Sequence, residues 1–153
     1  MIVVSDTSPL TALLTVNRSD VLPQLFAEVV VPRAVWDELR RSHVDLPAWL
    51  KVREVTDAQE TARLANLLDQ GEAEAIELAK ELRADLLLID ERKGRRLAAE
   101  EGVPVIGLLG VVLLAKRRGL IPSARTLMEA LRTEAGAYLS DELLDMALRS
   151  VGE

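Results

Sequence analysis

Histidine, cysteine and aromatic residues are nearly missing from this chain of 153 residues. It contains one histidine and no cysteine, and aromatic residues make up only 3% of it. The absence of cysteine excludes a thiolate nucleophile, a disulfide and a zinc finger, and one histidine cannot form a cluster of histidine metal ligands. Any catalysis must therefore rest largely on carboxylates, hydroxyls and cations.

Long apolar runs and targeting signals are missing as well. No stretch of the sequence approaches the ~20 apolar residues that a membrane span needs. The N-terminal apolar run has no cationic segment before it and is interrupted by Asp6, so it does not read as a signal peptide. We therefore expect a soluble, cytoplasmic protein with no membrane partner.

What the chain does have is aliphatic residues and acids. Apolar residues make up 49% of it, and 25 acidic residues outnumber 19 basic ones, for a net charge of −6. A chain of this length and composition can bury a sizeable aliphatic core, and we expect a single domain over residues 1–153. The negative balance argues against a general basic surface for nucleic acid, although it does not exclude a local basic groove.

Short apolar runs alternate with segments of helical spacing. The runs at 2–4, 29–31, 86–89 and 103–106 predict strands buried on both faces, and a half-polar run at 52–55 indicates a fifth. Helix starts are signalled at Ser8-Pro9, at Pro32, by capping-box patterns that begin at Thr56 and Asp69, and at Ser140. This alternation predicts βαβ units and a parallel sheet.

Two acids directly follow apolar runs, whereas Asp85 precedes one. They are Asp6 and Asp90. Ligands of an open parallel sheet bind beyond the carboxyl ends of its strands, so both acids are placed to reach a ligand. Each also has a structural alternative: Asp6 as a turn residue before a helix cap at Ser8, and Asp90 as the cap of the following helix.

Two glutamates on helical segments add to these acids. Glu72 projects into an apolar helix face, which is costly unless a partner satisfies it, and a capping box with Asp69 would do so. Glu38 borders the apolar stripe of the helix after Pro32, where a solvated flank is the alternative. The acids expected on the opposite, solvated side of the Glu72 helix are Glu74, Glu77 and Glu81.

If these four acids converge, they repel one another strongly unless a cation is bound. Ligation by oxygen alone, without histidine or cysteine, suits Mg²⁺ or Mn²⁺. Two such ions roughly 3.5–4 Å apart support in-line attack of water on a phosphodiester. The acids therefore predict a metal site with phosphodiesterase chemistry.

Ordered motifs from residue 2 to about 120 resemble those of PIN domains, specifically the toxin-type group. The motifs are Ser5-Asp6-Thr7-Ser8-Pro9-Leu10, Val31-Pro32-x-x-Val35-x-x-Glu38-Leu39, Gly71-Glu72-Ala73-Glu74-Ala75-Ile76, Leu87-Leu88-Ile89-Asp90 with Gly94-Arg95, and Gly107-x-x-Gly110. The resemblance implies a three-layer α/β/α fold with a central parallel sheet of four to five strands. It also implies a metal-dependent endoribonuclease, commonly the toxin of a toxin–antitoxin pair.

Carried over residue by residue, the catalytic and metal-binding acids would be Asp6, Glu38, Glu72 and Asp90, with Ser8 in support or serving only as a helix cap. The implied cofactor is Mg²⁺ or Mn²⁺, and the implied partners are an RNA substrate, a cognate antitoxin protein and a second copy in a homodimer. PIN domains usually carry Thr or Ser two residues before the fourth acid, where this chain has Leu88, and often a further acid beyond it, where this chain offers Glu91 and then Lys93. These departures leave open whether one or two ions bind.

Two basic runs are candidates for RNA contact. The run after Asp90 contains Arg92, Arg95 and Arg96, which we expect to contact phosphates, with an exposed helix face as the alternative. The run 116–118 precedes Gly119 and is expected to complement a helix C-terminus. Aromatic platforms for bases are nearly absent, so base-specific contacts are not predicted.

Two other functions compete with the nuclease hypothesis. One is a PIN-like module that binds RNA or protein without full nuclease activity. The other is a phosphotransfer domain of the receiver or phosphatase type, which also uses strand-end aspartates with Mg²⁺. The second is disfavoured because no further aspartate lies near Asp6 and no lysine is placed at a strand end.

Overall fold

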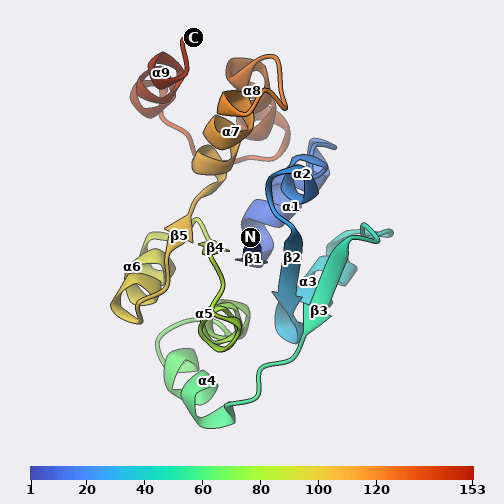
Figure 1. The fold of residues 1–153 in the computed structure, drawn as a ribbon, viewed down its shortest axis with the longest axis vertical. Helices are drawn as coiled ribbons and strands as arrows, with labels where there is room; N and C mark the ends of the chain where they lie inside the picture. The colour runs from blue at the N-terminus through green and yellow to red at the C-terminus, as the bar shows by residue number, and fades with distance from the viewer.

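A five-stranded parallel sheet forms the centre of the computed structural model, which describes residues 1–153 (Figure 1). The strands are β1 (Ile2–Ser5), β2 (Glu28–Pro32), β3 (Leu50–Arg53), β4 (Leu86–Leu88) and β5 (Val105–Ile106). They are ordered β3-β2-β1-β4-β5, and every neighbouring pair is parallel. Helices cover both faces, so the predicted three-layer α/β/α fold is confirmed.

Side chains of the central strands alternate between two hydrophobic cores. Val29 and Val31 point into one core, and Val30 between them points into the other, as the two-residue period of a strand requires. The larger core is covered by α1 (Thr7–Thr15), α2 (Val21–Leu25), α3 (Arg33–Ser42), α7 (Leu108–Arg117), α8 (Ala124–Glu134) and α9 (Asp141–Ser150). The smaller core is covered by α4 (Ala58–Ala65), α5 (Gln70–Leu82) and α6 (Arg92–Glu100).

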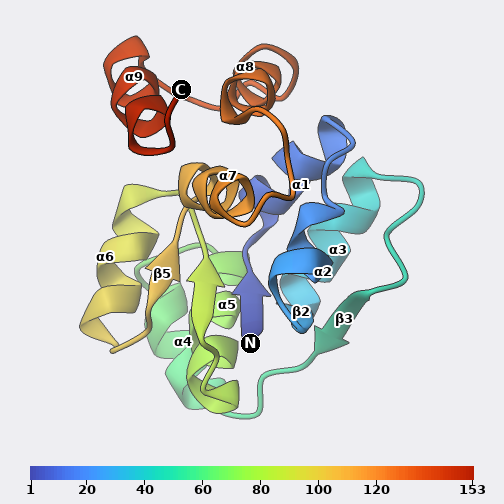
Figure 2. The same cartoon turned by 45° about the horizontal axis from the view of Figure 1, so that its top comes forward.

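The order of the strands reverses beside β1. From β1 the chain builds outward to β2 and β3, and it then returns to place β4 and β5 on the other side. The arrows of β1, β4 and β5 point toward α7 in Figure 2. In such sheets the crevice between two strands that lead away in opposite directions is where ligands bind. The carboxyl ends of β1 and β4 flank that crevice here.

Two strands differ from their predicted positions. The third strand lies at 50–53 instead of 52–55, because buried Leu50 pairs with Val29 while Glu54 is exposed to solvent. The last strand starts at Val105, after Pro104, which has no N–H to donate to the sheet. The carbonyl of Pro104 still accepts a hydrogen bond from Leu87 N–H at 2.8 Å.

The helix starts are partly as predicted. The capping box of Asp69 and Glu72 is confirmed, and so is the Ser140 cap of α9. Two starts were misplaced: α1 begins at Thr7 after Asp6, not at Ser8-Pro9, and the cap of α4 is Asp57, not Thr56. Thr56 instead donates its N–H and hydroxyl to the Glu81 carboxylate on α5. No helix has the length and apolar character needed to cross a bilayer.

Candidate active site

Asp6 and Asp90 lie at neighbouring strand ends on either side of the crevice. Ser5 pairs with Leu88 across β1 and β4, and Asp6 N–H donates to the Leu88 carbonyl at 2.9 Å. Asp6 therefore leaves β1 directly at the carboxyl edge, and Asp90 follows two residues after the end of β4. Both acids therefore lie at the carboxyl edge of the sheet, as predicted from the sequence.

The Asp6 side chain is buried among other acids. It is only 7% exposed, and although Asp6 is the N-cap residue of α1, its carboxylate makes no capping hydrogen bond. Burial, together with the nearby charges of Asp69, Glu38 and Glu91, raises the pKa of Asp6 to about 7 against an opposing hydrogen bond from Thr7 N–H. Helix capping therefore does not account for this carboxylate.

Glu72 is buried in the first turn of α5, with 4% of its surface exposed. Its Oε1 accepts a hydrogen bond from Asp69 N–H at 3.4 Å, and Glu72 N–H donates to Asp69 Oδ1 at 2.8 Å. Its Oε2 is buried without a hydrogen-bond partner. Burial raises the pKa of Glu72 to about 8, with further contributions from Asp69, Glu91 and Asp6. The capping box thus satisfies one oxygen and leaves the other free for a proton or a cation.

Glu38 reaches the same region from α3. A Cβ atom added at Gly71 would lie 2.7 Å from Glu38 Oε1 and 3.6 Å from Asp69 Oδ1. The Glu38 carboxylate therefore lies against Gly71 in the first turn of α5, and a side chain at position 71 would crowd it. Glu38 is half-buried, as its border position on the helix predicted.

Two acids that sequence reasoning did not assign to the site belong to this acidic cluster, which we define as Asp6, Glu38, Asp69, Glu72 and Glu91. Asp69 faces both Asp6 and Glu72, and Glu91 acts on the same two residues. The sequence carried a signal for each: Asp69 shares the capping turn of Glu72, and Glu91 directly follows the strand-end Asp90.

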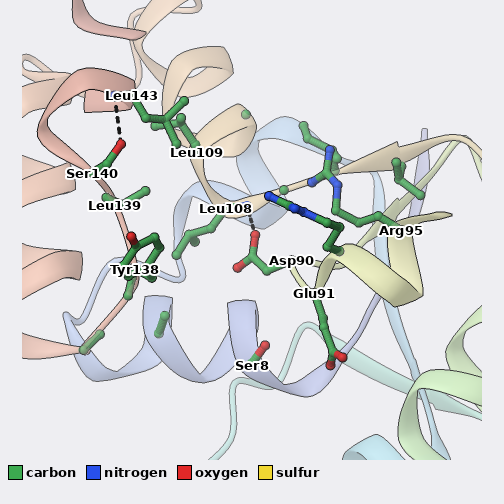
Figure 3. A pocket seen from close by; sticks show the side chains of 18 of the residues that line it. Ser8, Asp90, Glu91, Arg95, Leu108, Leu109, Tyr138, Leu139, Ser140 and Leu143 are labelled. Atoms are coloured by element: carbon green, nitrogen blue, oxygen red, sulfur yellow. Dashed lines mark hydrogen bonds between the residues drawn. The ribbon is translucent and has the colours of Figure 1, made fainter. Parts of the chain in front are cut away.

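The Asp90 carboxylate is hydrogen-bonded to the start of α7, and the charge that acts on it is that of Arg95 and not that of an acid of this cluster. Its Oδ1 accepts a hydrogen bond from Leu108 N–H at 2.7 Å (Figure 3). Desolvation raises the pKa of Asp90, whereas this bond and the Arg95 guanidinium lower it. The N-cap of the following helix α6 is Glu91, so the alternative that Asp90 caps that helix is wrong.

A cleft of about 1240 Å³ opens beside Asp90. Asp90, Glu91, Arg92 and Arg95 line it from the end of β4 and the start of α6, and Ser8 lines it from α1 (Figure 3). Ser8 is exposed in the second position of its helix and is not the cap residue, so the alternative of a purely capping role fails. Arg96 is exposed and does not line the cleft.

A family model described as a PIN domain (DUF3368) matches residues 2–153 of this chain. The chain belongs to the PIN domain family. A similar solved structure is that of a PilT N-terminus domain protein from the hyperthermophilic archaeon Sulfolobus solfataricus P2, with a TM-score of 0.55 and 25% sequence identity over 72% of this chain and 90% of that chain. No curated protein matches the chain. PIN domains are commonly nucleases.

The acids of this PIN domain fit a divalent cation by their chemistry. They offer only oxygen ligands, Glu72 Oε2 is buried without a partner, and burial together with neighbouring acids raises the pKa of Asp6 and Glu72. In their present positions no three acidic side chains form a group that could hold a metal ion. The fold brings Asp6, Glu38 and Glu72 into one neighbourhood and leaves Asp90 on the cleft side.

The side of α5 that was expected to be solvated is in fact packed. Glu77 is only 3% exposed, and the half-buried Glu81 accepts hydrogen bonds from Thr56 and Asp57. Half-buried Glu74 accepts a hydrogen bond from Ala34 N–H at 3.1 Å, at the start of α3. Helical phase placed these acids opposite the apolar face correctly, but α3 and the segment before α4 cover that side of this PIN domain.

The second basic run has a structural role at one position. Lys116 Nζ donates to the Pro122 carbonyl at 2.7 Å and pairs with Glu153 at 3.4 Å, near the C-terminal end of α7. Lys116 and Arg117 stand in the last turn of α7, where the prediction placed them, but the bonds of Lys116 go to residues beyond the helix. The first run differs, because Arg92 and Arg95 face the cleft.

Proposed function

We propose that this PIN domain is a Mg²⁺- or Mn²⁺-dependent endoribonuclease that hydrolyses phosphodiester bonds of RNA. The observation that carries the proposal is the buried pair Asp6 and Glu72, whose pKa values are raised to about 7 and about 8 at the crevice of the sheet. Charged acids buried together in this way are costly for the fold alone and are typical of sites that bind cations.

In this proposal Asp6, Glu38 and Glu72 hold the metal ion, and Asp90 joins them from the cleft side. A bound Mg²⁺ or Mn²⁺ supplies an activated water nucleophile and stabilisation of the leaving oxygen. The free Oδ2 of Asp90 can accept a further contact while its Oδ1 stays bonded to Leu108 N–H. Arg92 and Arg95 contact phosphates of the strand, and Ser8 supports the site from α1. Arg96, which lies outside the cleft, contributes to RNA binding only through its charge.

Cleavage of a single-stranded RNA by the purified protein tests the proposal. We expect cleavage with Mg²⁺ or Mn²⁺, none with chelator, and loss of cleavage in Asp6→Asn and Asp90→Asn. Calorimetric titration with Mn²⁺ gives a second readout, in which Asp6→Asn should bind the ion at least about tenfold more weakly. Metal-independent cleavage, or full activity in both variants, would contradict the proposal.

A binding module without full nuclease activity is the second candidate. It is favoured by the observation that no three acidic side chains are grouped so that they could hold a metal ion. The same titration separates the two candidates: RNA binding without cleavage and without Mn²⁺ binding would support the module.

We also propose that the chain acts in the cytoplasm as the toxin of a toxin–antitoxin pair, as a homodimer held inactive by a cognate antitoxin protein. The resemblance of the motifs to the toxin-type group supports this proposal. Induced expression in bacteria should arrest growth, and Asp6→Asn should relieve the arrest. Normal growth despite detectable active protein would count against a toxin role while leaving the nuclease proposal intact.

A further inference from the structure

The cleft beside Asp90 has a second wall, opposite the arginines. Residues 135–140, which connect α8 to α9, line it together with Glu142 and Leu143 of α9. In Figure 3, Tyr138 and Leu139 lie on one side of the cavity and Arg95 on the other, with Asp90 between them. The cleft is therefore charged at the α6 end and apolar along the 135–140 wall.

Tyr138 is the aromatic residue of this chain that packing does not explain. Its side chain is 94% exposed, whereas Phe26 is 1% exposed and Trp36 and Trp49 pack against the larger core. An aromatic ring that stays in water although it lines a cleft keeps its face free for a ligand.

We propose that Tyr138 stacks on a base of the RNA strand in this cleft while Arg92 contacts a neighbouring phosphate. This inference rests on the proposed ribonuclease function and says where the strand lies relative to Asp90. A cavity of about 1240 Å³ exceeds the roughly 300–1,000 Å³ of small-molecule sites, so it has room for more than one nucleotide. Stacking on one aromatic side chain tolerates any base, which suits binding without a fixed sequence.

The lining of the cleft carries both signs of charge, with Arg92 and Arg95 beside the acids Asp90, Glu91 and Glu142. Its two arginines favour a nucleic acid over a protein segment. The apolar wall alone would also suit a peptide, but Arg92 and Arg95 stand across from it, next to the proposed metal ligand Asp90. A strand of nucleotides has both parts, a charged backbone and apolar base faces, and it can contact both walls at once.

Anisotropy of a labelled single-stranded RNA, measured in chelator so that no cleavage occurs, tests the inference. We expect Tyr138→Ala to raise the Kd about tenfold, as expected for ~1–3 kcal/mol per stacked base, and Tyr138→Phe to stay within about twofold of the wild type. Met146→Ala is the matched control, because Met146 is a 68% exposed apolar residue of α9 that does not line the cleft. With an RNA that carries abasic sites, the wild type and Tyr138→Ala should bind alike.

Equal affinity of the wild type and Tyr138→Ala for the intact RNA overturns the inference, and it leaves the nuclease proposal standing if cleavage still depends on Asp6. A change from dimer to monomer in Tyr138→Ala, with RNA affinity unchanged, also overturns it and assigns the wall to a second copy. Absence of both binding and cleavage in the wild type would overturn the inference together with the proposed function.

Discussion

Two buried carboxylates of this PIN domain lie near other carboxylates, and the burial and repulsion of their charges are unfavourable for folding. Asp6 and Glu72 are both nearly fully buried, and burial raises the pKa of each, with further contributions from neighbouring acids, Asp69 and Glu91 among them. Without a cation, the fold must accept either their repulsion or their protonation. Removing one charge should therefore stabilise the metal-free protein and weaken its response to metal.

We expect Asp6→Asn to raise the midpoint of thermal unfolding in chelator. We also expect Mn²⁺ to raise the midpoint of the wild type and Asp6→Asn to abolish that rise. Binding of an ion to the folded state alone raises stability, so the shift should scale with Mn²⁺ concentration. Thermal unfolding followed by circular dichroism measures both effects. Asp37→Asn is the control, because Asp37 is an exposed acid of α3 outside the cluster. A Mn²⁺ shift of the same size in Asp6→Asn would exclude Asp6 as a ligand.

The raised pKa of Glu77, which lies outside the acidic cluster, can be tested through the pH dependence of stability. Burial and the neighbouring Glu81 raise its pKa to about 7 from the ordinary 4.5, although Lys80 lies 3.3 Å away. Between these two values the folded state binds more protons than the unfolded chain, so stability falls as the pH rises. Glu77→Gln should remove this loss and be more stable than the wild type near pH 8 by roughly 1–2 kcal/mol.

Urea unfolding near pH 5 and near pH 8 measures the effect of Glu77→Gln. The two proteins should differ less at the lower pH, because the glutamate is then largely protonated in the folded state. An unchanged difference between wild type and variant at the two pH values would show that Glu77 keeps an ordinary pKa. Cleavage activity should stay near that of the wild type, since Glu77 is outside the acidic cluster.

The first turn of α5 contains both Glu72 and Gly71, and the Glu38 carboxylate lies against Gly71. Gly71→Ala should displace the Glu38 carboxylate, since the added Cβ would lie 2.7 Å from its Oε1 at the flexible end of the side chain. Alanine also favours a helix by up to about 1 kcal/mol over glycine. We expect unchanged or higher stability with at least about tenfold lower cleavage. Parallel losses of stability and cleavage would instead point to backbone damage.

The start of α3 depends on Glu74, which accepts the Ala34 N–H. An acid at a helix N-terminus contributes about 1 kcal/mol through a free N–H and the helix dipole. Glu74→Ala should therefore lower the free energy of unfolding by about that amount and reduce cleavage by shifting α3 with Glu38. Glu74→Gln keeps an acceptor oxygen and should lose less of both. Equal behaviour of Glu74→Ala and the surface control Asp37→Ala would refute this role.

The strands and their end acids could be predicted because parallel strands buried on both faces leave continuous apolar runs. The runs at 2–4 and 29–31 coincide with β1 and β2, and Asp6 follows the first directly. The surroundings of Glu77 could not be predicted, because helical phase describes one helix at a time and not the neighbours that cover its far side. The bond from Leu108 N–H to Asp90 likewise joins residues 18 positions apart through the return of the chain to β5 and α7.

At the scale of the whole molecule, the 135–140 wall of the cleft depends on how α8 and α9 are held against the rest of the fold. Both helices pack apolar residues into the larger core, and Glu153 adds a polar attachment. Its carboxylate accepts hydrogen bonds from Ser123 Oγ at 2.9 Å, Ala124 N–H at 2.6 Å and Arg125 N–H at 3.2 Å, and it pairs with Lys116 of α7. These bonds lower the pKa of Glu153 to about 2, so their contribution is complete above the ordinary value and is lost as the pH falls toward 2.

Glu153→Gln should therefore loosen the start of α8 and, with it, the 135–140 wall of the cleft. Hydrogen exchange at neutral pH should be faster in α8 and α9 and unchanged in β1 and β4, because the central strands unfold only with the whole sheet. Glu129→Gln, an exposed acid of α8, is the matched control. If the wall positions Tyr138 for RNA, this variant should also bind RNA more weakly without losing its Mn²⁺ response, since Glu153 is far from the acidic cluster along the chain and shares no bond with it. Unchanged exchange in α8 would mean that the packing of α8 and α9 on α7 holds the wall without Glu153.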